Sequence, residues 1–377
     1  MRVDFSTPMN KDGTIADDSR IKATLPSIQY VIKHKGKLIL LSHLGRPKGA
    51  QDPTLSLKPI AKRLSELLGR PVQFCTELKE AKNRASHLKE GEVLLLENLR
   101  FHKGEEEPEK DPHFAVMLSE LGELYVNDAF GAAHRAHSST AMIAKYFPKA
   151  SAAGFLMEKE VAALSSLLTP KHPFFVVMGG AKISTKIGVI ENLLQTVDRL
   201  FLGGGMAYPF LKAKGVEVGA SLIEPGSVEL AEKIMQKAKK KIELPVDLVI
   251  AESFSAEAKR KIVSVEEGVL PSWQGMDIGP KTVQLWKRAF SEAATIFWNG
   301  PLGVYEMAPF MKGTKEIAQA LSQCQAKVVV GGGDSAAAVA QLGLESSFHH
   351  VSMGGGAALE FLEFGHLPGI DCLTDVR

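Results

Sequence analysis

The sequence has 377 residues, of which 45% are hydrophobic and 23% charged, and its formal net charge at pH 7 is +2. A chain of this length can form more than one domain. A nearly neutral chain has no global affinity for nucleic acids or membranes, so any anion site must be local. Without an apolar signal region or a long apolar stretch, we expect a cytoplasmic protein. A reducing compartment is indicated by three isolated cysteines without metal-ligand spacing, Cys75, Cys324 and Cys372.

Short apolar runs alternate with longer amphipathic stretches along the whole chain. The runs that predict strands are Leu38–Ser42, Val93–Leu96, Tyr125–Asn127, Phe174–Met178, Leu200–Leu202, Leu248–Ala251, Thr295–Trp298, Val328–Val330 and His350–Ser352. Between them, segments such as Pro59–Leu68 and Thr185–Thr196 have apolar residues at helical spacing. Continuous apolar strands that alternate with helices indicate an α/β fold whose parallel sheets are covered on both faces.

A change near residue 150 indicates a domain boundary. An apolar stripe from Leu156 to Leu168 ends at Thr169-Pro170, which predicts a helix. We expect two α/β domains, residues 1–150 and 170–360, joined by a linker helix over residues 151–169. The basic run Lys237–Lys241 is either a solvated helix end or a targeting signal, and the helix end is favoured because cations complement the helix dipole.

Three arginines, Arg46, Arg100 and Arg135, follow predicted strands of the first half. The carboxyl ends of parallel strands meet at one edge of a sheet, where ligands bind. Arginine matches phosphate and carboxylate groups with two parallel hydrogen bonds. Each arginine alone would more often form a surface ion pair. Their repeated position after strands favours a site for a small polyanion.

Other polar residues of the first half add to this interpretation. Arg20 lies at a predicted helix start, and His43 directly follows a strand. Asp4 could orient a substrate hydroxyl or pair with an arginine. His134 and His137 could ligate a metal, but no third histidine or cysteine lies nearby, which favours hydrogen-bonded histidines.

Four glycine-rich segments follow apolar runs in the second half, Gly179-Gly180, Gly203–Gly205, Gly331–Gly333 and Gly354–Gly356. A strand that runs through glycines into a helix brings backbone N–H groups close to a ligand. The helix N-terminus behind them favours negative charge. Several such loops on one sheet suggest a polyphosphate site.

Charged residues accompany these glycines. If a helix begins at Lys182, the four-residue spacing places Lys182 and Lys186 on one face at its positive end, where a bound anion would compensate their charges. Asp334 follows a glycine triplet, and a carboxylate there repels phosphate unless a nucleotide-bound Mg²⁺ lies between them. Asn299 and Glu306 could bind a ligand and its ribose, or could equally be a turn cap and a surface residue.

A polyanion site on one domain and a Mg-nucleotide site on the other suggest phosphoryl transfer with domain closure that excludes water. Together the motifs resemble the phosphoglycerate kinase family. The stretches that carry the resemblance are Arg2–Phe5, Ser42–Pro47, Leu96–His102, Asn127–Gly131, His134–His137, Gly179–Lys182, Gly203–Ala207, Trp298–Pro301, Gly331–Asp334 and Gly354–Ala357.

The resemblance extends from Arg2 to about Ile370 and implies two Rossmann-like domains, with a tail over residues 361–377 that returns to the N-terminal domain. It implies reversible phosphoryl transfer between 1,3-bisphosphoglycerate and MgADP, giving 3-phosphoglycerate and MgATP, by a monomer without nucleic-acid or membrane partners. Both nucleophiles, a phosphate oxygen and a carboxylate, are already anionic. The reaction therefore needs no general base.

Matching positions imply the roles of individual residues. The residues expected to bind phosphoglycerate are Asp4, Ser6, Arg20, His43, Arg46, Arg100 and Arg135. Those expected to bind the nucleotide are Lys182, Lys186, Gly203, Gly204, Asn299, Glu306, Gly332, Gly333, Asp334 and Ser335. We assign Arg20 and Lys182 to the transferring phosphoryl group, and Asp334 to Mg²⁺.

The sequence departs from the family pattern at several positions. Ser6 stands where the family usually has Asn, Thr185 where it often has Asp, and Ala132 where it often has Thr. Phe364 replaces a usual Gly near the end of the chain. Met1 lies inside the expected first strand, so we expect the N-terminal sheet to lack half a strand and to be less stable than in an N-terminally extended chain.

Two other functions are compatible with parts of the sequence. Residues 331–336 fit Gly-x-Gly-x-x-Ala loosely, as in a nicotinamide-dependent dehydrogenase. The incomplete fingerprint and the lysines at 182 and 186 argue against this function. A non-catalytic binder could retain the phosphate sites without turnover, and a coupled assay with MgATP and 3-phosphoglycerate separates it from an active kinase.

We predict that Ser6 weakens phosphoglycerate binding, because a hydroxyl reaches less far than an asparagine amide. The loss of one hydrogen bond corresponds to about 1 kcal/mol. Ser6→Asn should therefore lower the KM for 3-phosphoglycerate in steady-state kinetics. An unchanged KM would count against the idea.

Overall fold

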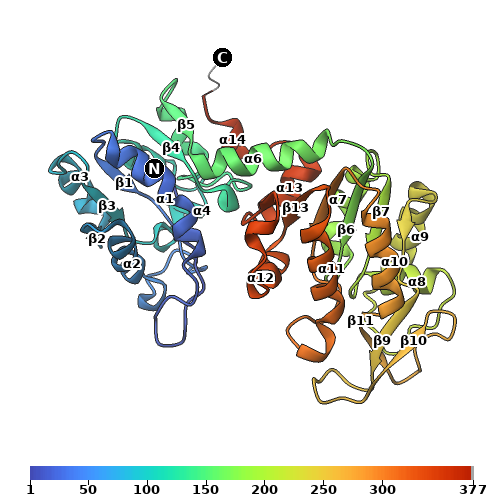
Figure 1. Ribbon diagram of the computed structural model, residues 1–377. Helices are drawn as coiled ribbons and strands as arrows, with labels where there is room; N and C mark the ends of the chain where they lie inside the picture. Colours follow the sequence, from blue (N-terminus) through green and yellow to red (C-terminus); the bar gives the residue numbers. More distant parts are fainter. Residues whose placement is uncertain (375–377) are drawn as a thin grey trace. The chain divides into compact units, whose positions relative to one another are not determined.

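The computed structural model describes residues 1–374, and the chain folds into two compact units (Figure 1). Of the described residues, the first unit contains Met1–Ala162 together with residues 366–374, and the second contains Ala163–Gly365. The division falls within helix α6 (Phe155–Leu168). The last part of the chain therefore belongs to the first unit.

The first unit is built on parallel strands joined by the N-terminal segment. A three-stranded sheet has the order β1-β3-β2, and a second pair is β4-β5. The backbone of Arg2 forms parallel bridges to both Leu41 and Asn127, and so connects the two groups. The strands are β1 (Leu38–Leu40), β2 (Val72–Cys75), β3 (Val93–Leu96), β4 (Tyr125–Asn127) and β5 (Ser151–Ala153).

Helices cover both faces of this sheet because its strands alternate between two cores. In β3, Val93 and Leu95 belong to one core, whereas Leu94 and Leu96 belong to the other. Successive side chains of a strand point to opposite faces, so a strand without polar positions must be buried on both. The helices are α1 (Ser19–Lys33), α2 (Lys58–Leu68), α3 (Leu78–Ser86), α4 (Lys103–Glu106), α5 (Pro112–Ser119) and α14 (Pro368–Asp371), with 3₁₀ turns η1 (Pro53–Leu55), η2 (Leu99–Phe101), η3 (Phe130–Ala132) and η4 (Met142–Tyr146).

The second unit contains a six-stranded parallel sheet in the order β14-β13-β12-β6-β7-β8. Its strands are β6 (Phe174–Met178), β7 (Arg199–Leu202), β8 (Ile242–Glu243), β12 (Thr295–Asn299), β13 (Lys327–Gly331) and β14 (His350–Val351). The helices are α7 (Ile187–Leu193), α8 (Ala207–Ala213), α9 (Ser227–Ala238), α10 (Pro280–Phe290), α11 (Lys312–Gln323), α12 (Gly333–Gln341) and α13 (Gly356–Phe364), with 3₁₀ turns η5 (Ser184–Lys186), η6 (Ala308–Phe310) and η7 (Glu345–Ser347).

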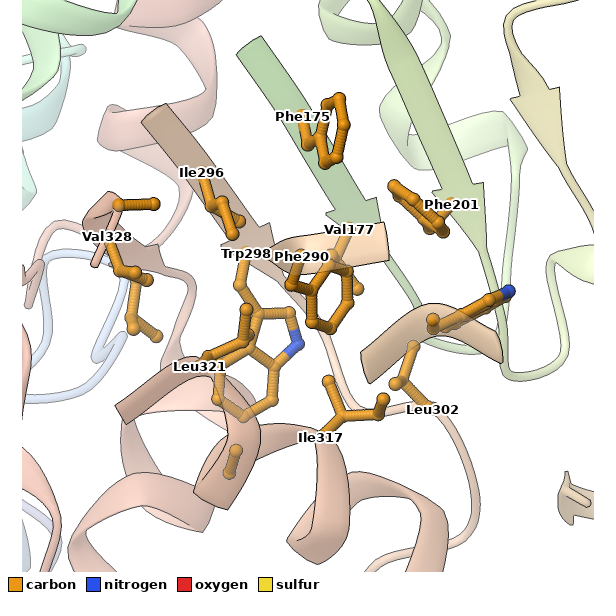
Figure 2. Packing of buried hydrophobic residues seen from close by; sticks show 14 of the residues in the cluster. Phe175, Val177, Phe201, Phe290, Ile296, Trp298, Leu302, Ile317, Leu321 and Val328 are labelled. Carbon is orange, nitrogen blue, oxygen red and sulfur yellow. The ribbon is translucent and has the colours of Figure 1, made fainter. Parts of the chain in front are cut away.

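Trp298 of β12 lies at the centre of the main core of this unit and is fully buried. Figure 2 shows its indole among Phe290, Ile317 and Leu321, which come from α10 and α11. The indole Nε1 donates a hydrogen bond to the carbonyl of Gly300 at 2.9 Å. The core therefore also fixes the first residue of the loop that follows β12.

An antiparallel sheet in the second unit corrects the expectation of parallel sheets alone. It has the order β10-β9-β11, with β9 (Asp247–Ala251), β10 (Arg260–Ser264) and β11 (Gln274–Ile278). The strand β10 is mostly exposed, and the β9–β11 pairing is irregular between Gly275 and Asp277. Neither β10 nor β11 has the continuous apolar run on which the strand predictions rested.

The predicted strands are all present, several with ends shifted by one or two residues. Two helix predictions need correction. Residues 151–153 form β5, so the helix that we expected from residue 151 begins at Phe155. The predicted helix Thr185–Thr196 is a 3₁₀ turn, η5, followed by α7. The fold is mixed α/β with mainly parallel sheets, which confirms the predicted class.

Candidate active site

The carboxyl edge of the first unit's sheet carries a cluster of basic side chains. His43 follows β1, Arg100 lies in η2 after β3, and Arg135 follows η3 after β4. Burial and the guanidinium groups of Arg100 and Arg2 lower the pKa of His137 to about 3. The parallel strands thus bring these groups together, and their combined positive charge favours a bound anion.

Arg2 is a member of this cluster that the sequence analysis did not select. It is fully buried, and its Nη2 lies 2.8 Å from Nδ1 of His43. Its Nε donates to Oγ of Ser139 at 2.8 Å, and the Ser139 hydroxyl donates to the buried carboxylate of Glu105 at 2.6 Å. Arg2 and Asp4 have the two-residue spacing of one strand face, which is the signal that could have identified Arg2.

Asp4, Ser6 and Arg20 form a hydrogen-bonded group. Nη1 of Arg20 pairs with the Asp4 carboxylate and donates to Oγ of Ser6 at 3.1 Å. The Ser6 hydroxyl donates to the same carboxylate. Burial alone would raise the pKa of Asp4, but the Arg20 guanidinium holds it far below its usual range. Asp4 is therefore ionised, and it pairs with an arginine, which is one of the two roles that the sequence left open.

The remaining arginines differ in exposure. Arg100 is nearly buried, and it donates to the Gly45 carbonyl at 2.8 Å while its Nε lies 3.1 Å from Glu106. Arg46 and Arg135 are exposed. Arg100 is thus held in place by the protein, whereas the guanidinium groups of Arg46 and Arg135 are accessible to a ligand.

Four glycines after β6 and β7, at positions 179, 180, 203 and 204, use their N–H groups in backbone hydrogen bonds. Gly179 and Gly180 donate to the carbonyls of Asn299 and Pro301 at 2.9 and 2.8 Å. Gly203 and Gly204 donate to the carbonyls of Met178 and Leu302 at 2.8 and 3.0 Å. A Cβ on Gly179 would overlap the Pro301 carbonyl. These glycines interlock backbone with backbone, which corrects our expectation that their N–H groups face the ligand.

The glycines at the N-termini of α12 and α13 are different, because the space beside them is open. A Cβ on Gly333, Gly355 or Gly356 would meet no atom within 4 Å. Gly332 has a φ of +92°, which favours glycine. The first turn of α12 therefore presents accessible backbone at the positive end of a helix, where phosphate binds readily.

Ser335 and Asn299 lie beneath this loop. The buried Ser335 hydroxyl accepts a hydrogen bond from the Gly300 N–H at 2.5 Å. Nδ2 of Asn299 donates to the Gly331 carbonyl at 2.9 Å. Within residues 1–374, Oδ1 of Asn299 is buried without a hydrogen-bond partner. This oxygen is an acceptor that a ligand donor could satisfy.

The two lysines lie in different environments, and the expectation of a shared helical face was wrong. The helix α7 begins only after Lys186, because η5 precedes it. Nζ of Lys186 donates to the carbonyls of Gly179 and Asn299 at 2.6 and 3.3 Å. Burial lowers its pKa to about 8, although Asp334 counteracts the shift. Lys182 is exposed, and its Nζ lies 3.9 Å from Glu224.

Asp334 and Glu306 are both exposed beside the open loop. Burial raises the pKa of Tyr305, and Asp334 and Glu306 raise it further, so the three groups are neighbours. No group of three or more histidine, cysteine or acidic residues that could hold a metal is found among residues 1–374. One carboxylate beside an open helix N-terminus fits a cation that arrives with phosphate groups, since the phosphates supply further oxygen ligands.

The other departures from the family pattern lie in ordinary surroundings. Oγ1 of Thr185 donates to the Lys182 carbonyl at 3.0 Å. Ala132 is buried in η3, and Phe364 is exposed at the end of α13. Nothing in the structure explains the change at Phe364.

A basic cluster on one α/β unit and an open glycine loop at a helix N-terminus on the other are typical of a phosphotransferase of the kinase class. The family model described as phosphoglycerate kinase matches residues 1–365. The chain belongs to the phosphoglycerate kinase family, which confirms the resemblance seen in the sequence. The family and its curated members support phosphoglycerate kinase activity in glycolysis.

Relatives and solved structures agree with this assignment. Phosphoglycerate kinases from Pseudothermotoga lettingae and Thermosipho africanus are 50% and 52% identical, over 100% of this chain and 96% and 95% of theirs. The structure of phosphoglycerate kinase from Coxiella burnetii is similar with a TM-score of 0.87 and 40% identity, over 98% of this chain and 94% of that chain. The enzyme from Pyrococcus horikoshii OT3 has the same TM-score with 35% identity, over 99% and 94%.

We predict that alanine destabilises the protein at a closed glycine but not at an open one. Gly179→Ala forces a methyl group into the Pro301 carbonyl and should lower the free energy of unfolding by about 1–3 kcal/mol. Gly333→Ala adds a methyl group in open space and should change it by less than about 1 kcal/mol, while raising the KM for the nucleotide. Urea denaturation and steady-state kinetics measure both effects, and equal destabilisation by the two variants would contradict the distinction.

We also predict that His137 makes the protein acid-sensitive. Its pKa lies below the ordinary 6.5, so the unfolded chain binds more protons as the pH falls from 6.5 towards 3, and stability is lost over that range. Between pH 7 and pH 5 the wild type should lose about 2 kcal/mol more than His137→Gln. Urea denaturation at both pH values measures the difference. The exposed control His87→Gln should follow the wild type, and parallel losses in all three proteins would contradict the prediction.

Proposed function

We propose that the basic cluster binds the phosphoglycerate and that the Gly332–Ser335 loop binds the nucleotide phosphates. The convergence of His43, Arg100 and Arg135 at one sheet edge supports the first assignment. The open space at Gly333 supports the second, because backbone N–H groups at a helix N-terminus bind phosphate. The convergence of the arginines is the observation that carries the proposal, since a generic nucleotide binder has no use for it.

The nucleotide is used as its Mg²⁺ complex in this proposal. Asp334 would hold the Mg²⁺ that arrives with the nucleotide, and the cation would neutralise charge on the phosphates. Asn299 offers its unsatisfied Oδ1 to the nucleotide, and Glu306 accepts from a ribose hydroxyl. Lys186 holds the loops after β6 and β12 together, so it places the phosphate site and adds positive charge beneath it.

Charge stabilisation, rather than proton transfer, does the chemical work in this proposal. In both directions the attacking oxygen is already anionic, so no general base is required. Burial and the Arg2 guanidinium hold the pKa of His43 well below its usual range, so this imidazole is neutral at pH 7 and serves as a hydrogen-bonding group. Arg20 and Lys182 stabilise the transferring phosphoryl group as charge shifts between oxygens. Domain closure would bring the substrates together and exclude water.

We further propose a cytoplasmic monomer that acts on small molecules alone. The near-neutral net charge of +2 supports the absence of a nucleic-acid partner. No helix among residues 1–374 has both the length and the apolar character needed to cross a membrane. Membership of a kinase family gives no support to the dehydrogenase alternative.

We predict that Arg20→Ala and Lys182→Ala each lower kcat about 10²–10³-fold, because each removes a cation from the transferring group. A coupled assay with MgATP and 3-phosphoglycerate measures the effect. The matched controls are Lys22→Ala on the same helix as Arg20 and Lys212→Ala on α8, both exposed lysines that should retain wild-type kcat. Wild-type turnover in either test variant would contradict the catalytic assignments, and an inactive wild type would favour the non-catalytic binder.

A further inference from the structure

Asp277 lies near the end of β11, and its buried carboxylate has no role in the proposed phosphoryl transfer. Asp277 is 2% exposed. Oδ2 accepts a hydrogen bond from the Gly313 N–H at 2.7 Å, and Oδ1 accepts one from the Ile278 N–H at 2.9 Å. Gly313 lies in the first turn of α11, so the carboxylate sits at the positive end of that helix.

Two glycines enclose this carboxylate. A Cβ on Gly303 or on Gly313 would overlap Oδ1 of Asp277. The carboxylate therefore fills the space between the loop after β12 and the start of α11. Because interiors are closely packed, a change in the charge or size of this side chain would shift the neighbouring loop and helix.

The loop after β12 is attached to the same two elements that Asp277 joins. The Val304 N–H donates to the Met276 carbonyl of β11 at 2.9 Å. The Leu302 N–H donates to Oγ1 of Thr314 in α11, also at 2.9 Å. Glu306 follows directly in the chain, so its position depends on how β11 and α11 are held together.

We propose that Asp277 is a positioning residue for the nucleotide: its ionised carboxylate holds the Leu302–Glu306 loop against β11 and α11, and nucleotide affinity follows its ionisation. This inference rests on the proposed function, in which the loop after β12 contacts the nucleotide. A neutral acid would offer a poorer acceptor to the Gly313 N–H, and its own proton would need an acceptor in a space closed by two glycines.

The surroundings place this ionisation near neutral pH. Burial raises the pKa of Asp277 to about 7, against the N–H groups of Gly313 and Ile278, which lower it. Glu316 of α11 adds a further rise, and it is itself paired with Lys287 of α10 at 3.1 Å and with Lys312 at 3.8 Å. The Tyr208 hydroxyl of α8 also faces this carboxylate, whose charge raises the tyrosine pKa beyond the effect of burial.

The test is the affinity for MgADP, measured by isothermal titration calorimetry from pH 6 to pH 8. Asp277→Asn should weaken binding about tenfold at pH 8, where the wild-type carboxylate is ionised. The ratio of the variant and wild-type dissociation constants should approach 1 at pH 6. Because the phosphate of ADP titrates equally in both measurements, the ratio isolates the contribution of Asp277.

Asp247→Asn is the matched control. Asp247 is also 2% exposed and lies in the same antiparallel sheet, but it accepts from Lys281 and Thr282 at the start of α10. We expect its ratio to stay constant with pH. If Asp277→Asn does not fold, Asp277→Ala carries the test with the same expected ratios, because it also removes the ionisable group.

Three outcomes would overturn the inference. A ratio for Asp277→Asn that does not change with pH, or the same pH-dependent ratio in Asp247→Asn, would show that ionisation of Asp277 does not govern affinity. A wild-type protein that binds no MgADP at any pH would contradict the proposed function and the inference with it. Binding by the wild type with a constant ratio contradicts the inference alone.

Discussion

The interlocked backbone around the loop after β12 is the constraint on which the proposed nucleotide site depends. The carbonyls of Asn299, Pro301 and Leu302 accept hydrogen bonds from glycines that follow β6 and β7. The ammonium group of Lys186 donates to the carbonyls of Asn299 and Gly179. The Gly300 N–H is bound by Ser335 of α12. Loops from four strands are thereby fixed to one another. A site built on such a platform needs little reorganisation when charge moves, which is what phosphoryl transfer requires.

In the first unit, the constraint is the close approach of several positively charged side chains. Burying an unpaired charge is costly, so a buried arginine needs an acidic partner or a full set of hydrogen bonds. Asp4 pairs with Arg20, and Glu106 pairs with Arg100. Arg2 donates to the Ser139 hydroxyl, which in turn donates to the Glu105 carboxylate. These internal acids keep the cations in place, while the exposed Arg46 and Arg135 leave charge available to an anion.

The sequence predicted the elements whose signal is local. Strands such as β3 and β6 are continuous apolar runs, because parallel strands are buried on both faces, and their bounds agree with the prediction. The antiparallel sheet was not predicted because β10 is mostly exposed and the pairing of β11 is irregular. The three residues of β5 were assigned to a helix, since a strand this short is defined by its pairing with β4 rather than by its own composition.

By itself, the sequence determined the α/β class, the position of the arginines after strands and, through its motifs, the family. Only the tertiary structure decided which glycines are closed and which are open, and that Lys186 points inward while Lys182 stays exposed. It alone placed Arg2 against His43 and the Asp277 carboxylate against the first turn of α11. The physical reason is that periodicity and turn chemistry act over a few residues. Whether an N–H group faces a ligand or another loop depends on backbones that lie more than a hundred residues away in the chain, as Gly179 and Asn299 do.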